Sequence, residues 1–167
     1  TVGTYDVTGL GLVIRRGRYN PGVRTPNHGE HTIDVSQINS AAGTAQNDVL
    51  QCLDVPAETL VMAAGVEVLT ACSSSVVIDI GVTGSTAGFS DPDAFVDAYD
   101  ATGAAYAPRD VADAAPMLTI KTADTIDALM AGAASAAGKI RVWAILCDVA
   151  GVDETDRQSS TQHDTAQ

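Results

Sequence analysis

The strictest pattern in this sequence is an alternation of apolar side chains over residues 75–82, SVVIDIGV. Its even-numbered positions are all Val or Ile, and Asp79 and Gly81 lie between them. Successive side chains of a β-strand point to opposite faces of the sheet, so this spacing predicts a strand with one buried face. The opposite face, which carries the Asp, is expected to be the more exposed one.

Similar segments recur along the chain. In the last of them Ile140, Val142, Ala144 and Leu146 share one face, which we expect to be buried. Gly65, inside a long apolar segment, is expected to mark a bulge or bend. Aromatic residues make up only 4% of the chain, so the core must consist of Val, Ile, Leu and Ala, while 15 glycines suit the turns of a β-rich protein. Strands are expected within residues 9–17, 31–38, 48–55, 58–72, 75–82, 116–122, 124–132 and 138–151.

The segment DPDAFVDAYDATG, residues 91–103, departs from this pattern. Asp91 suits a helix N-cap, Pro92 suits the first helical position, and Asp93 suits the positive end of the helix dipole. The apolar residues at positions 95, 96 and 99 fall at helical spacing. We therefore expect a short helix or a turn-rich excursion here, with a strand over residues 94–99 as the alternative.

The number and spacing of the strands predict an all-β fold. Roughly eight to ten short strands are typical of antiparallel sandwiches and jelly rolls. No helical pattern is long enough to build βαβ units. We expect an antiparallel β-sandwich or jelly-roll body over residues 47–150. An extended N-terminal arm with short strands, residues 1–46, would precede it, and a polar tail, residues 151–167, would follow.

Charge is distributed unevenly between these parts. Residues 1–46 carry four arginines against three acids, a net +1, whereas residues 47–167 carry five bases against eighteen acids, a net −13. A total of −12 argues against nucleic acid as the main partner. The asymmetry favours an arm that lies on an acidic neighbour, such as another copy of the chain. The candidate partner-binding arginines are Arg15, Arg16, Arg18 and Arg24.

Trp143 is a further candidate for partner binding. It lies on the second face of the last strand, which begins with Lys139 and Arg141 and then becomes apolar. An apolar stretch on an otherwise exposed face indicates coverage by another element or another subunit. No apolar run approaches the roughly 20 residues that a membrane helix needs, so no membrane partner is expected.

No catalytic motif stands out, and we expect a protein that is not an enzyme. The serine-rich segments lack the nucleophile elbow, and TGSTAG lacks the lysine of a phosphate-binding loop. His28, Glu30 and His31 are close in sequence, but a strand or turn would point them in different directions. Neither a metal nor a cofactor is expected, although the acidic run from Asp91 to Asp100 leaves Ca²⁺ as an alternative. The three cysteines are expected to be buried, reduced thiols.

Residues 47–149 resemble the head decoration or cement proteins of tailed bacteriophages. The resemblance is carried by DVLQCLDVPAETLVMAAGVEV, by SVVIDIGVTG leading to DPDAFVDA, and by the closing AAGKIRVWAIL. It implies a jelly-roll or similar β-fold that forms homotrimers on the capsid exterior, where it contacts the major capsid protein and stabilises the shell. A receptor- or glycan-binding domain of a phage fibre or spike is the alternative, and it would require exposed aromatic residues in a groove.

Overall fold

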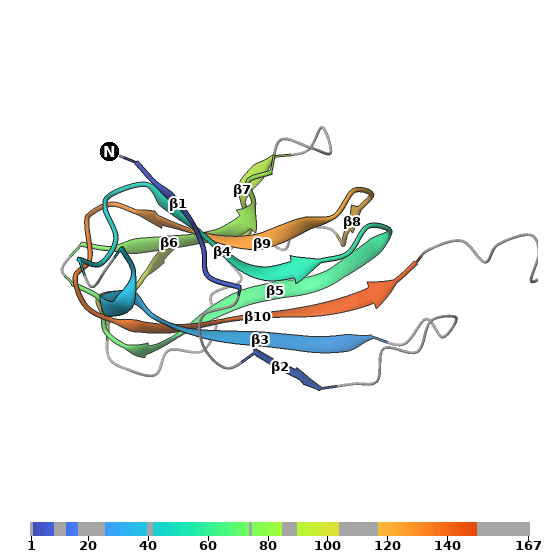
Figure 1. The fold of residues 1–167 in the computed structure, drawn as a ribbon, viewed down its shortest axis with the longest axis horizontal. Helices are drawn as coiled ribbons and strands as arrows, with labels where there is room; N and C mark the ends of the chain where they lie inside the picture. Colours follow the sequence, from blue (N-terminus) through green and yellow to red (C-terminus); the bar gives the residue numbers. More distant parts are fainter. Residues whose placement is uncertain are drawn as a thin grey trace, which may run out of the picture.

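The chain forms two five-stranded β-sheets that pack face to face (Figure 1). The computed structural model describes residues 2–8, 13–16 (main chain only), 26–39, 42–73, 75–84, 90–103 and 117–149. The predicted all-β sandwich is confirmed. Its elements are β1 (Thr4–Asp6), β2 (Val13–Arg16), β3 (Asn27–Asp34), the 3-10 turn η1 (Val35–Gln37), β4 (Asp48–Val55), β5 (Thr59–Thr70), β6 (Val77–Val82), β7 (Asp91–Asp100), β8 (Leu118–Ile120), β9 (Asp124–Ala131) and β10 (Lys139–Asp148).

Neighbouring strands in each sheet are mostly far apart in sequence. The first sheet has the order β1-β4-β9-β6-β7, and the second has the order β2-β3-β10-β5-β8. All pairs are antiparallel except β1 and β4, which run parallel. β10 therefore lies in the middle of the second sheet, between β3 and β5.

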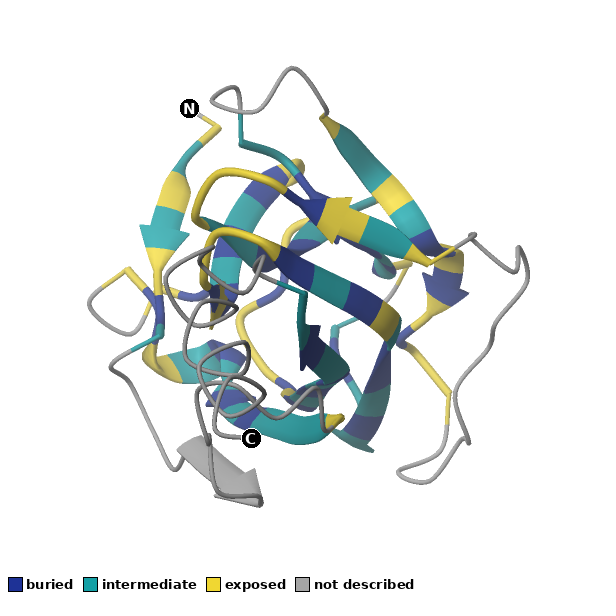
Figure 2. Cartoon of the chain, turned by 90° about the vertical axis from the view of Figure 1, so that its right-hand side faces the viewer, coloured by how far each residue is buried: buried dark blue, intermediate teal, exposed yellow. Residues whose placement is uncertain are grey.

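The core lies between the two sheets and is filled by β-branched and other aliphatic side chains. Ile78 and Ile80 of β6 are fully buried, as are Ile140 and Val142 of β10. The alternation predicted for both segments is confirmed, although Leu146 is only partly buried. Figure 2 shows the same alternation as bands of buried and less buried residues along the strands.

The helix expected over residues 91–103 is wrong, and the alternative strand is confirmed as β7. Between Ile78 and Ile80 of β6, β7 contains one extra residue, because their partners are Tyr99 and Val96. Such a bulge changes the apolar spacing from two residues to three, which imitates a helix in the sequence. Ala98 has a φ of +50° in this bulge, and its N–H donates to the Asp79 carboxylate at 2.7 Å.

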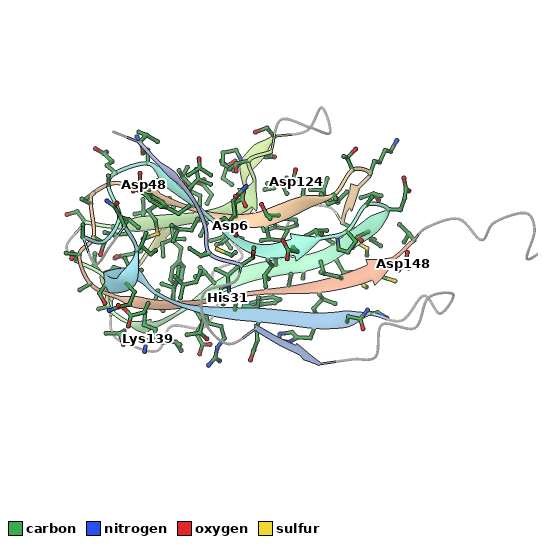
Figure 3. All side chains as sticks on the ribbon, viewed as in Figure 1. Asp6, His31, Asp48, Asp124, Lys139 and Asp148 are labelled. Carbon is green, nitrogen blue, oxygen red and sulfur yellow. The ribbon has the colours of Figure 1, made fainter. Side chains whose placement is uncertain are left out.

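The first 46 residues supply β1 to one sheet and β2 and β3 to the other, and they also contain η1. β1 is anchored by the buried Asp48, whose carboxylate accepts hydrogen bonds from the Gly3 and Ala45 N–H groups, each at 2.6 Å. His31 of β3 is fully buried, and its Nδ1 lies 3.0 Å from the carbonyl oxygen of Cys52 in the opposite sheet (Figure 3). The tail, residues 151–167, lies outside the described residues.

The three cysteines are free and buried, as predicted. Burial, the largest effect, and the nearby Asp127 charge raise the pKa of the Cys52 thiol far above its ordinary value. This thiol is therefore protonated and unreactive in the folded protein. No helix in the described part of the chain is long and apolar enough to cross a membrane.

Candidate functional site

The outer face of the second sheet carries the chain's single tryptophan. Ile140, Val142 and Ala144 of β10 point into the core, so Trp143, between the last two, points to the opposite face. Its side chain is partly exposed. The main-chain partners of Trp143 are Glu30 on β3 and Gly65 on β5.

Gly65 lets the indole lie against the backbone of β5. A Cβ atom built on this glycine would be 2.8 Å from the Cζ2 atom and 2.9 Å from the Cε2 atom of Trp143. Only a residue without a side chain leaves room for the ring at this point. The bulge predicted at Gly65 is wrong: the pairing shifts lie on either side of it, between Lys139 and Ile140 and between Ile145 and Leu146.

His28 extends the aromatic surface. Its ring is stacked nearly parallel to the indole of Trp143, at an interplanar angle of 16° and a centroid separation of 6.4 Å. His28 lies opposite Ile145 in the β3–β10 register, and Ile145 is two residues along β10 from Trp143. Residues directly opposite in an antiparallel pair share a face of the sheet. The two rings thus form a flat aromatic patch on the outer face.

Charged residues border this patch. Arg141 on β10 forms an ion pair with Glu67 on β5, with 3.0 Å between Nη1 and Oε2. Glu30, opposite Trp143 on β3, is partly buried and has no hydrogen-bond or ion-pair partner among the described residues. The patch therefore combines an aromatic ring with a neighbouring carboxylate, a combination that suits a cationic group. We call Trp143, Glu30, His28 and Gly65 the Trp143 site.

The structure brings three of the five predicted site residues into one sheet. Arg15 and Arg16 lie on β2, where they pair with Gly29 and His28 of β3. Trp143 lies on the next strand, β10. The other two arginines, at positions 18 and 24, lie outside the described residues.

The acidic run on β7 does not form a metal centre in the described part of the chain, where no group of three or more His, Cys, Asp or Glu side chains is placed to hold an ion. A side-chain hydrogen bond with Asp93 is the largest cause that raises the pKa of Asp91. Burial raises the pKa of Asp79, and repulsion from Asp97 and Asp93 adds to the effect. His31 is buried in the core, whereas its neighbour in sequence, His28, lies on the outer face.

Sequence reasoning missed His28, Glu30 and Gly65 as members of the Trp143 site. Two signals were present: His28 and Glu30 are two residues apart, which is one face of a strand, and Gly65 interrupts a β-branched segment. What the sequence does not give is the register that places β3 and β5 on either side of Trp143. That register depends on contacts between residues that are far apart in the chain.

No protein-family model matches the chain, and no curated protein matches it either. A chain in the solved structure of the cyanophage Pam1 capsid asymmetric unit is similar to it, at 17% sequence identity and a TM-score of 0.49. The alignment covers 83% of this chain and 94% of that chain. The likeness thus extends over most of the length of both.

Proposed function

We propose that this chain is a structural virion protein that binds the outside of a tailed-phage capsid as a homotrimer and stabilises the shell. The observation that carries the proposal is the Trp143 site: a flat aromatic patch, bordered by the Glu30 carboxylate, on the outer face of a fully paired central strand. Aromatic residues on an exposed, rigid face are typical of contact surfaces between proteins.

The sequence resemblance supplies the kind of partner. Segments of residues 47–149 resemble head decoration proteins, and the fold is a β-sandwich of the sort that this resemblance implies. The proposed partners are the major capsid protein and other copies of the chain. Each trimer would contact several capsid subunits at once, so that individually weak contacts would add up to stable attachment.

The proposal assigns separate roles to the predicted site residues. Trp143 is assigned to the contact between copies, because its strand is central and its ring lies flat against the sheet. Arg15 and Arg16, on the edge strand β2, are assigned with the rest of the Arg-bearing arm to acidic surfaces of a neighbour. The net charge of −12 supports neighbours that are proteins rather than nucleic acid.

The first test is light scattering after gel filtration of the purified chain, followed by mixing with empty capsids of the same phage. We expect a homotrimer that binds the capsids and raises the temperature at which they break open. A protein that leaves the disruption temperature unchanged would contradict the stabilising role. If the chain ignores capsids but binds host cells or glycans, the receptor-binding alternative replaces the proposal.

A further inference from the structure

The first three residues of β7, Asp91, Pro92 and Asp93, suit a helix cap in the sequence but begin an edge strand in the structure. Capping therefore does not explain why they stand together. We propose that the Asp91–Pro92 peptide bond is a self-cleavage site, which the folded chain hydrolyses with Asp93 as the proton donor. This is the single Asp–Pro bond in the sequence, and the inference does not depend on the proposed function.

An Asp–Pro bond carries its own nucleophile. The Asp91 carboxylate can attack the carbonyl carbon of its own residue and form a cyclic anhydride, while the C–N bond to Pro92 breaks. The departing Pro92 nitrogen becomes an amine by taking a proton from a neighbouring acid. Water then opens the anhydride and leaves two carboxyl groups on Asp91. The sum of these steps is the hydrolysis of one peptide bond by one water molecule.

Asp93 is placed to supply the proton. Side chains two residues apart in a strand point to the same face of the sheet, so those of Asp91 and Asp93 are neighbours. Their carboxyl groups share a hydrogen bond, which is the largest cause of the raised pKa of Asp91. When the pair holds a single proton, one carboxyl group is ionised and the other is an acid. That state combines the nucleophile and the proton donor that the reaction needs.

The main chain at this bond is held against the neighbouring strand. Asp91 pairs with Val82 of β6, and a Cβ atom on Gly81 would overlap the carbonyl groups of Asp91 and Pro92. The bond therefore lies directly on the Gly81 backbone and has a fixed orientation, which an unfolded chain lacks. Asp91 and Pro92 are half-buried, so water can reach the anhydride. Because fixed geometry accelerates intramolecular reactions, the folded chain should react faster than the unfolded one.

The other carboxyl groups around β7 leave Asp93 as the acid next to the bond. The titratable side chains on the strands packed against β7 are Asp79 of β6, Glu67 of β5, and Asp124 and Asp127 of β9. Among the described residues, Asp93 is the one charged neighbour that shifts the pKa of Asp91.

Cleavage of folded and unfolded protein tests the proposal. The full chain is incubated at about pH 5, where part of the carboxyl pairs hold a proton, once in buffer and once in urea. Circular dichroism confirms that the first sample is folded. Mass spectrometry should show fragments 1–91 and 92–167, and the second should begin with Pro92. The folded chain should be cleaved at least about tenfold faster, and cleavage should stop at about pH 8, where both carboxyl groups are ionised.

Variants of the acid separate its role from the strand's stability. Asp93→Asn should lower the rate in the folded protein at least about tenfold, whereas Asp93→Glu keeps a carboxyl group and should retain cleavage. Asp97→Asn is the matched control. Both Asp93 and Asp97 raise the pKa of Asp79, but only Asp93 shares a hydrogen bond with Asp91. This control should be cleaved like the wild type.

Three results would overturn the inference. Equal rates in buffer and in urea would assign the reaction to the Asp–Pro sequence alone. Equal rates for Asp93→Asn and the wild type, both folded by circular dichroism, would remove Asp93 from the reaction. A folded chain that stays intact while the unfolded chain is cleaved would show that β7 protects the bond.

Discussion

Replacement of Gly65 by Ala tests whether the position of the indole depends on this glycine. The added Cβ would be 2.8 Å from Trp143, against 3.4 Å at the inner limit of ordinary contact, so the ring must withdraw by at least 0.6 Å or tilt outward. Overpacking in a core costs about 1–3 kcal/mol, and the partial exposure of Trp143 favours the lower end, about 1 kcal/mol. Loss of glycine's freedom in the unfolded chain offsets this by about 0.4–1 kcal/mol.

Gly29→Ala is the matched control. Gly29 lies in the same sheet, and a Cβ on it would meet nothing within 4 Å, so only the effect on the unfolded chain applies. We expect Gly65→Ala to be less stable than Gly29→Ala by about 1 kcal/mol, or about 2–4 °C in Tm.

Fluorescence gives the sharper readout, because all indole emission comes from Trp143. In Gly65→Ala the displaced ring should emit at longer wavelength, while Gly29→Ala should emit like the wild type. Identical emission and equal stability of the two variants would show that the ring does not lie against Gly65.

Three further outcomes are expected. Asp48→Asn leaves one side-chain oxygen to accept from either the Gly3 or the Ala45 N–H, so the other N–H loses its partner. The variant should lower the unfolding free energy by about 1–3 kcal/mol and increase amide exchange in β1. Unchanged exchange would contradict the anchoring role of Asp48. His31→Leu should lower the unfolding free energy, measured by urea unfolding, by about 1–3 kcal/mol, because the Cys52 carbonyl loses its buried partner. A variant more stable than the wild type would contradict this. Burial raises the folded-state pKa of Asp127 above 3.8, so the stability from its protonated form is present below pH 3.8 and lost as pH rises through the folded pKa. The stability of wild type relative to Asp127→Asn should therefore fall as pH rises above 3.8 and through the folded pKa, and a difference in unfolding free energy that does not change with pH would refute it.

The strand content of this protein is determined by local sequence. Alternation at 75–82 and 138–151 and the scarcity of aromatic residues predict β-strands and an aliphatic core without any tertiary information. The segment 91–103 shows the limit of that reasoning. Its cap residues and spacing match a helix, yet pairing with β6 forms a strand, because a bulge accommodates the extra residue and Asp79 satisfies a main-chain N–H in it.

The composition of the Trp143 site was decided by tertiary structure alone. The sequence places Trp143 on the less buried face of its strand, but its neighbours come from β3 and β5, more than 70 residues away along the chain. Register in a sheet is set by the fit of whole faces and by main-chain pairing, and a slip of one residue moves every side chain to the other face. Only the assembled sheet, therefore, puts Glu30 and Gly65 on either side of the indole.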